Sequence, residues 1–305
     1  MEGGTTSAAI RVLGSGSAGN CSVVCRTAGD GERRAVLIDA GLSPRRTLRL
    51  LRESGLTLDH VDAVLLTHLD SDHWRIAWTS VLPRSVPILA HQRHRDWGVA
   101  QGILPEWTVG FDRPFEIGSV GAGAGTVRVL PELLSHDELG VAAFRFDFPF
   151  TGERTRSATP PATLGYATDL GRVTPRLVEH LRGVGVLAIE SNYCRAMQLE
   201  SSRPWALKQR IMGGRGHLSN HEAVTAVAAL APRHVVFLHL SRDCNRAELV
   251  ADLHAGGDYE FTIAEQHRPT RWVRITPGPP PHALPPVAPP EPVLWAGSDR
   301  EGAAS

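Results

Sequence analysis

Short apolar runs alternate with amphipathic segments along most of this 305-residue chain. The apolar runs end near Gly, Asn or Asp, which is typical of β-strands bounded by turns. Strands are expected at residues 10–14, 21–27, 35–41, 61–68, 86–91, 140–148, 163–171, 184–191, 234–241 and 270–277. Helices are expected at residues 43–55, 91–97, 174–182, 205–212, 220–231 and 246–254. This alternation predicts an α/β protein.

Acidic residues and histidines recur where the expected strands end. The residues in such positions are Asp39, His68, Asp169, Glu190 and His239. Strands with helical connections bring these ends to one rim of a sheet, where α/β proteins build their sites. The pattern therefore predicts one functional site assembled from distant parts of the chain.

The strongest chemical signal is the stretch "THLDSDHW", which places His68, Asp70, Asp72 and His73 within six residues. Imidazoles and carboxylates are common ligands of divalent first-row metals. A loop leaving a strand can turn His68 and Asp70 toward one ion, and Asp72 and His73 toward a second. A solvated acidic loop is the alternative interpretation.

Three residues further along the chain complete this pattern. His136 lies between two β-like runs, and Asp169 and His239 follow strands. They can supply a third ligand for the first ion, a bridging carboxylate and a closing histidine for the second ion. Each of them alone could equally be a hydrogen-bonded structural residue.

Composition narrows the class of protein. The chain has 32 basic and 32 acidic residues, so a globally basic nucleic-acid binder is not indicated, although a local basic patch remains possible. No apolar stretch reaches the ~20 residues of a membrane span, and the N-terminus lacks the pattern of a signal peptide. We expect a cytoplasmic protein without a membrane segment. Nothing in the sequence indicates an obligate protein partner.

The expected organisation is one hydrolase domain at residues 8–276 between two atypical ends. Residues 1–7 are small and polar, which predicts a flexible N-terminus. Residues 277–305 are rich in proline, which predicts a disordered tail. A proline-rich ligand for a partner domain is the alternative for this tail.

The order Asp39, "THLDSDH", His136, Asp169 and His239 resembles the metallo-β-lactamase superfamily over residues 8–275. Within that superfamily, "LGSGSAGNCSVV", "LIDAGLSPRR", "SHDELGVAAFRF", "IESNY", "LKQRIMGGRGHLSN" and "LHLSRDCN" resemble the WalJ/YycJ branch. Members of this branch are metal-dependent exonucleases acting on duplex DNA. The resemblance implies a four-layered αββα sandwich with metals at one edge of the sheets.

The resemblance also implies a role for each site residue. His68, Asp70 and His136 would bind one ion, and Asp72, His73 and His239 would bind the other. Asp169 would bridge the two ions. Asp39 would orient the loop at residues 68–73 by hydrogen bonds without binding metal.

Asp70 departs from the family pattern, in which a histidine stands at this position. A hard, anionic oxygen in place of an imidazole favours manganese among the expected Mn, Zn or Fe ions. The expectation is two divalent metal ions. The alternative is a lost first site, which would leave a mononuclear enzyme or a metal-binding protein without activity.

Two further segments could contact a substrate. In "GGRGHLSN", His217 is expected near the metals, assisting the leaving group, and Arg215, Ser219 and Asn220 precede or begin a helix, whose N-terminus can bind phosphate. The alternatives are a structural histidine and plain helix caps. In "GSGSAGN", Ser15 and Ser17 could border a phosphate, although a tight hairpin needs the same residues.

The expected function is a phosphodiesterase or nuclease that acts on DNA ends through a metal-bridging hydroxide, with Asp72 and His217 as catalytic residues. Two alternatives remain. One is a hydrolase of the same fold that cleaves a small phosphodiester or ester. The other is a non-catalytic metal-binding protein altered at Asp70.

Overall fold

The computed structural model describes residues 7–118, 125–135, 138–148, 161–279 and 284. The expected N-terminal segment at 1–7 and the proline-rich tail at 277–305 lie largely outside these residues and stay predictions. Strand β1 begins at Ser7. No helix in the described ranges is long and apolar enough to cross a membrane.

The described residues form two seven-stranded sheets. The first has the order β14 (Val273–Arg274), β1 (Ser7–Gly14), β2 (Cys21–Thr27), β3 (Arg33–Ile38), β4 (Val61–Leu65), β5 (Ile88–His91) and β6 (Val109–Phe111). The second has the order β13 (Glu260–Ile263), β12 (His234–Leu238), β11 (Val186–Glu190), β10 (Ala162–Ala167), β9 (Val141–Phe148), β8 (Val127–Leu134) and β7 (Phe115–Ile117). Strands β3 to β6 and β10 to β13 pair in parallel within their sheets.

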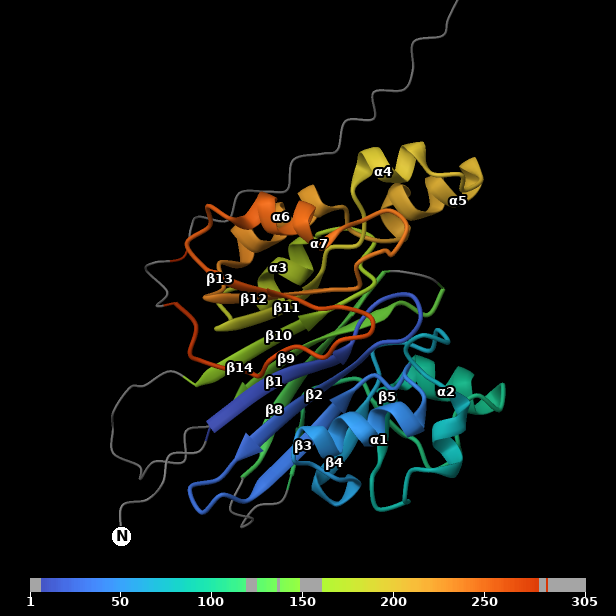
Figure 1. Cartoon of the computed structure of the whole chain (residues 1–305). Helices are drawn as coiled ribbons and strands as arrows, with labels where there is room; N and C mark the ends of the chain where they lie inside the picture. Colours follow the sequence, from blue (N-terminus) through green and yellow to red (C-terminus); the bar gives the residue numbers. More distant parts are fainter. Residues whose placement is uncertain (1–6, 119–124, 136–137, 149–160, 280–283, 285–305) are drawn as a thin grey trace, which may run out of the picture.

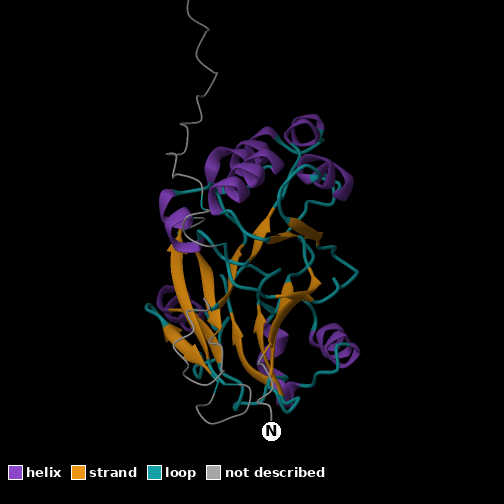
Figure 2. Ribbon diagram, turned by 90° about the vertical axis from the view of Figure 1, so that its left-hand side faces the viewer, coloured by secondary structure: helices purple, strands orange, loops and turns teal. Residues whose placement is uncertain are grey.

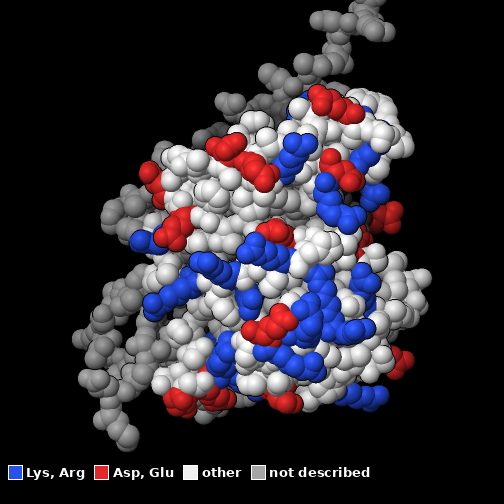
Figure 3. All heavy atoms as spheres, viewed as in Figure 1, with Lys and Arg blue, Asp and Glu red and all other residues white. Residues whose placement is uncertain are grey.

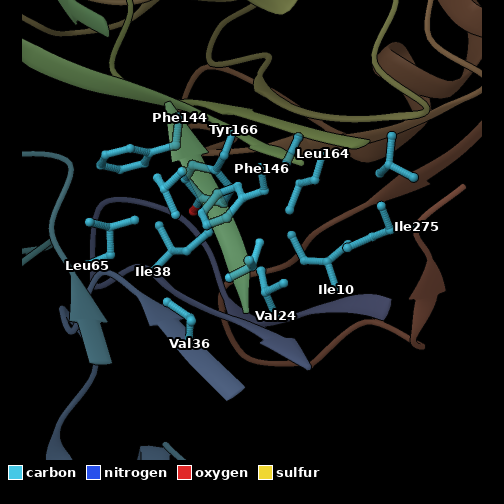
Figure 4. Packing of buried hydrophobic residues seen from close by; sticks show 14 of the residues in the cluster. Ile10, Val24, Val36, Ile38, Leu65, Phe144, Phe146, Leu164, Tyr166 and Ile275 are labelled. Carbon is cyan, nitrogen blue, oxygen red and sulfur yellow. The ribbon is translucent and has the colours of Figure 1, made fainter. Parts of the chain in front are cut away.

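The two sheets pack face to face over an apolar core. Ile38 and Leu65 of the first sheet face Phe144 and Tyr166 of the second (Figure 4). These side chains are almost fully buried, and burying each contributes about 1.5–3 kcal/mol of transfer free energy. This core fixes the distance between the sheets, and therefore between the loops at their rims.

Helices cover the outer faces of both sheets (Figures 1 and 2). Helices α1 (Pro44–Glu53) and α2 (Gln92–Ala100), with the short 3-10 helices η1 (Leu58–His60) and η2 (Ile76–Ser80), accompany the first sheet. Helices α3 (Pro175–Leu181), α6 (Asn220–Leu230) and α7 (Ala247–His254) cover the second. Helices α4 (Arg195–Glu200) and α5 (Trp205–Arg210) and the π-helical turn η3 (Ile211–Arg215) lie at its upper right in Figure 1. The architecture is the four-layered αββα sandwich, which confirms the expected fold class.

The ten expected strands and six expected helices are present, most within two or three residues of their predicted ends. Strands β6, β7, β8 and β13 and helix α4 were not expected. Pro131 lies within β8 and obscures it in the sequence, because proline lacks the N–H that a central strand donates. Among the described residues, β7 pairs with residues 127–129 and β9 with residues 128–134, so at Pro131 strand β8 has a partner on one side and forms an edge on the other, where proline is tolerated.

Candidate metal centre

The backbone turns sharply where three strands end at the candidate site. Asp39, Asp169 and His239 have φ values of +60°, +52° and +55°, in the left-handed region. Among the described residues, the remaining non-glycine residue with positive φ is Ala231. This conformation is uncommon for residues with a side chain and tends to occur at functional sites. It directs the side chains of all three residues into one region at the rim of the sandwich.

Asp39 holds the loop that follows β4. Its carboxylate accepts hydrogen bonds from the backbone N–H of Thr67 (2.8 Å), the Thr67 hydroxyl (2.9 Å) and Nδ1 of His73 (2.7 Å). Both Asp39 and His73 are fully buried. Because Nδ1 of His73 donates to Asp39, Nε2 is the ring nitrogen left for a metal ion. This geometry is the one expected of a residue that orients a ligand.

Asp169 lies at the centre of the cluster. Its Oδ2 is 3.0 Å from Nε2 of His73, and its Oδ1 is 3.7 Å from Nε2 of His239 and 3.3 Å from Nδ1 of His217. Asp72 contacts the same His239, with its Oδ2 3.2 Å from Nε2 of that ring. A carboxylate between histidines from three different elements suits the bridging position expected for Asp169.

Three overlapping groups of donor atoms could hold a metal ion, each with all its donor atoms within 4.8 Å of one another. They are His68, His73 and Asp169; Asp72, His73 and His239; and Asp169, Glu190, His217 and His239. The second group matches the set expected for the second ion. Neutral imidazole and carboxylate are the ligands that Zn, Mn and Fe accept, so the residues fit divalent cations.

The set expected for the first ion is only partly described. Nε2 of His68 is 3.8 Å from Oδ2 of Asp70, and the ring centroids of His68 and His73 are 4.1 Å apart. His68 is buried, whereas the Asp70 side chain is 55% exposed and belongs to none of the three groups in the described residues. His136 lies outside the described residues. Its role and that of Asp70 remain predictions.

The two buried carboxyl groups of the cluster have opposite electrostatic environments. Burial raises the pKa of Asp169, but His239 and His73 outweigh this effect and hold its pKa well below the ordinary value. Burial raises the pKa of Glu190 well above its ordinary value, and the negative charge of Asp169 adds to the increase. Asp169 therefore favours the charged form required of a ligand, and Glu190 favours the neutral form.

Glu190 lies in the site but is absent from the expected ligand set. Its position at the end of β11 had already indicated that it lies at the rim of the sheet. Its Oε2 lies 3.1 Å from Nδ1 of His217, and its Oε1 accepts the backbone N–H of Leu218 at 3.2 Å and that of Leu170. It ties the segment after β10 to the segment that carries His217. Burial also lowers the pKa of His217, whose side chain is 22% exposed.

Two asparagines were also missed. Nδ2 of Asn20 is 3.0 Å from Nε2 of His73 and 3.3 Å from Oδ2 of Asp72. Nδ2 of Asn192 is 3.0 Å from Nδ1 of His239 and 2.7 Å from its carbonyl oxygen. Asn20 ends the "GSGSAGN" loop, so the loop considered for phosphate contacts lies directly against the expected ligands.

The expected substrate contacts divide into buried and exposed residues. Ser15 donates to Oδ1 of Asn20 (3.0 Å) and accepts from the backbone N–H of His239 (2.8 Å). Ser219 forms a capping box with Glu222 at the start of α6. The structure therefore places the hydroxyl groups of Ser15 and Ser219 in bonds within the protein.

Asn220 follows the cap and is buried. Its amide bonds with the Ser191 hydroxyl (2.8 Å) and with Asn245 (2.8 and 2.9 Å). It is the first residue of α6 and takes part in this network, in contrast to the plain cap considered from sequence. Ser17 and Arg215 are exposed, and they are the two expected contacts whose side chains face solvent.

An αββα sandwich that collects histidines and carboxylates at its strand ends defines a metallo-hydrolase. The chain belongs to the β-lactamase superfamily, whose domain model matches residues 34–240. This confirms the resemblance inferred from the motifs.

Two relatives and one solved structure are similar to this chain over most of its length. Exodeoxyribonuclease YycJ of Bacillus anthracis is 30% identical over 78% of this chain and 84% of that protein. Exodeoxyribonuclease WalJ of Streptococcus pneumoniae is 27% identical over 82% of this chain and 91% of that protein. The metallo-β-lactamase fold protein YhfI of Bacillus subtilis superposes with a TM-score of 0.60 and 17% identity, covering 89% of this chain and 99% of that one.

Proposed function

We propose that this protein is a metal-dependent exodeoxyribonuclease that hydrolyses phosphodiesters at DNA ends. The similarity to exodeoxyribonuclease YycJ, which extends over 78% of this chain, carries the proposal. The histidine–carboxylate cluster supports it, because such a cluster can hold the divalent metal ions that assist phosphodiester hydrolysis. We also propose that the enzyme works in the cytoplasm, where cellular DNA is found.

We assign the ligands as the sequence pattern suggests. Asp72, His73 and His239 would hold the second divalent ion, and Asp169 would bridge to the first ion at His68 and Asp70. His136 would complete the set of the first ion. Divalent ions held by these residues would lower the pKa of a water molecule and neutralise charge on the phosphate. Asp70, a hard oxygen ligand, favours Mn²⁺ over Zn²⁺.

Three polar side chains hold the proposed histidine ligands in place. Asp39 fixes the tautomer of His73, and Asn20 and Asn192 border the rings of His73 and His239. These contacts restrict how the imidazoles can rotate, so the ligand atoms keep their relative geometry.

His217 is the candidate to assist the leaving oxygen. Its Nδ1 lies 3.1 Å from Glu190 and 3.3 Å from Asp169. When Nε2 also carries a proton, the Asp169 carboxylate stabilises the imidazolium, and Nε2–H can donate to a phosphate oxygen. We therefore assign His217 to the stabilisation of the leaving group, and Asp72 to the metal-binding catalytic set.

The deciding experiment compares substrates and metals with one purified protein. Metal-depleted protein is supplied with Mn²⁺, Zn²⁺ or Mg²⁺ and given 5′-phosphorylated duplex DNA, single-stranded DNA, RNA or bis-p-nitrophenyl phosphate. Asp72→Asn tests the site, and Asp243→Asn serves as a matched control because Asp243 is 73% exposed and paired with Arg203.

The proposal expects Mn²⁺-dependent degradation of duplex DNA from its ends, lost in Asp72→Asn and retained in Asp243→Asn. Cleavage of the small diester alone would favour the alternative hydrolase with a small substrate. Absence of turnover with every metal, together with one bound ion or none, would mean that Asp70 marks a site that has lost its catalytic chemistry.

A further inference from the structure

Two segments of this neutral chain concentrate positive charge. Helix α1 and residues 265–274 together contain seven arginines and two acidic residues. The arginines are Arg45, Arg46, Arg49, Arg52, Arg268, Arg271 and Arg274. The whole chain has equal numbers of basic and acidic residues, so this concentration is local. We call the surface formed by these two segments the arginine face.

The two segments form one continuous surface because half-buried arginines join them. Arg46 Nη2 donates to the carbonyl oxygen of Gln266 (2.5 Å). Arg11 of β1 donates to the carbonyl oxygen of Thr270 (2.9 Å) and to the hydroxyl of Ser54 (2.8 Å), which follows α1. Figure 3 shows the result as a band of blue side chains across the face where Figure 1 shows β14, β1 and α1.

The outward arginines of α1 share one side of the helix. Arg45, Arg49 and Arg52 are spaced i, i+4 and i+7, opposite the buried Leu50 and Leu51. Arg49 forms an exposed ion pair with Glu53 at 2.6 Å. Arg45 and Arg52 are exposed and have no ion-pair partner among the described residues.

Residues 265–274, the second segment, also carry exposed arginines. Arg268, Arg271 and Arg274 are exposed, and the described part of the chain supplies no ion-pair partner for any of them. A single solvated helix would account for the arginines of α1 alone. It does not account for a second segment, more than 200 residues away in sequence, that adds the same charge to the same surface.

A second positive cluster, formed by Arg203, Lys208, Arg210 and Arg215, is a weaker candidate for binding an anion. Lys208 donates to the carbonyl oxygen of Leu199 (2.6 Å) and is largely buried. Arg203 bonds to Asp243 at 3.0 Å. Internal partners therefore use two of the four charges of that cluster.

The arginine face begins at a loop that contacts the metal centre. Gln266 accepts the backbone N–H of Ala18 and donates to the carbonyl oxygen of Gly19, both at 2.8 Å. Asn20, in the same loop, donates its backbone N–H to the carbonyl oxygen of Asp72 at 2.7 Å. Arg75, which is exposed, bonds to the carbonyl oxygen of Ala18 at 3.2 Å. From this loop the face extends along α1, a helix of ten residues and therefore about 15 Å long.

We propose that the arginine face binds the sugar–phosphate backbone of duplex DNA several base pairs from the end being cleaved. This inference rests on the proposed function and adds the path of its substrate. Guanidinium groups match phosphate geometry in pairs of hydrogen bonds. A 15 Å helix spans about four base pairs of B-DNA. Such contacts carry no sequence information, so binding is independent of base sequence.

The test compares two charge-reversal variants of the full chain. The first is Arg45→Glu, Arg52→Glu and Arg271→Glu, all on the arginine face. The matched control is Arg84→Glu, Arg113→Glu and Arg128→Glu, which are also exposed. Arg113 follows β6 and Arg128 lies in β8, near the edges of the sheets opposite β14 and β13. Both variants change the charge equally.

Binding is measured separately from turnover. Fluorescence anisotropy with a duplex whose phosphorothioate linkages resist hydrolysis is recorded against salt concentration, with and without Mn²⁺. Hydrolysis of bis-p-nitrophenyl phosphate reports the metal centre alone. The arginine-face variant should bind DNA roughly ten- to a hundredfold more weakly, with a salt slope smaller by about three. Hydrolysis of the small diester should be unchanged.

Equal weakening in the control variant, or unchanged DNA binding in the arginine-face variant, would overturn the inference. Unchanged DNA binding combined with lost binding to phosphatidylglycerol vesicles would instead indicate an anionic lipid surface. A different result would refute the proposed function, namely that the unmodified protein cleaves no DNA with any metal. The binding comparison still decides the inference in that case.

Discussion

Replacing Asp39 by Asn isolates the contribution of a buried carboxylate that the proposed ligand set does not include. Asn tolerates the φ of +60° at this position, so the backbone is preserved. The amide oxygen can still accept the N–H of Thr67. The amide nitrogen, however, would face Nδ1 of His73, where a carboxylate oxygen now accepts at 2.7 Å.

This exchange reverses the tautomer of His73. With an N–H donor in place of the carboxylate, Nδ1 becomes the acceptor and the ring proton moves to Nε2, the nitrogen proposed to bind metal. Loss of such an orienting contact costs about 10–100-fold in metal affinity, or about 1.4–2.7 kcal/mol. A similar loss in kcat/KM is expected at limiting metal.

The assay is a titration of metal-depleted protein with Mn²⁺ in competition with a chelator, together with thermal unfolding. Asp62→Asn is the control, because Asp62 is also a largely buried acceptor, bonded to Arg26 and Arg34 at the opposite end of β4. The control should lose stability while keeping metal affinity. Metal affinity of Asp39→Asn within twofold of the original protein would refute the reasoning.

Three further outcomes are expected. Asp70→His should raise the ratio of zinc to manganese affinity, measured by competition between the two metals, because imidazole replaces a hard oxygen; an unchanged ratio would exclude Asp70 as a ligand. Burial raises the pKa of Cys21 far above its ordinary value, so at pH 8 a maleimide should modify the partly exposed Cys194 well before Cys21, as mass mapping would show. A Cβ on Gly41 would lie 1.7 Å from the carbonyl oxygen of Asp72, so Gly41→Ala should abolish activity and lower Tm. An unchanged crystal structure of that variant would contradict this expectation.

The sequence predicts the elements whose local pattern is unambiguous. Strands β10, β11 and β12 are continuous apolar runs that end at turn residues, and α6 begins with a Ser–Glu capping box. Strand β8 is not predicted from the sequence because Pro131 interrupts it and the residues after Val129 do not alternate between polar and apolar. Its strand conformation depends on β9, with which it pairs from Arg128 to Leu134.

In the site, too, residues with a local sequence pattern were predictable, and contacts between distant residues were not. Asp39, Asp169 and His239 were identifiable because each follows an apolar run. The contact of Glu190 with His217 joins residues 27 positions apart, and that of Asn20 with His73 joins residues 53 positions apart. Neither pair has a local signature, since hydrogen bonds of this kind depend on how the sheets and loops approach one another.

The left-handed backbone at Asp39, Asp169 and His239 restricts which amino acids these positions can exchange during evolution. Only Gly, Asn, Asp and His commonly adopt that conformation, and of these Asp and His are the strong metal ligands. Position 70 has no positive φ, so its backbone accepts many more residue types. Changes of metal preference in this fold are therefore most accessible through the loop at residues 68–73, while the strand ends keep the geometry of the site constant.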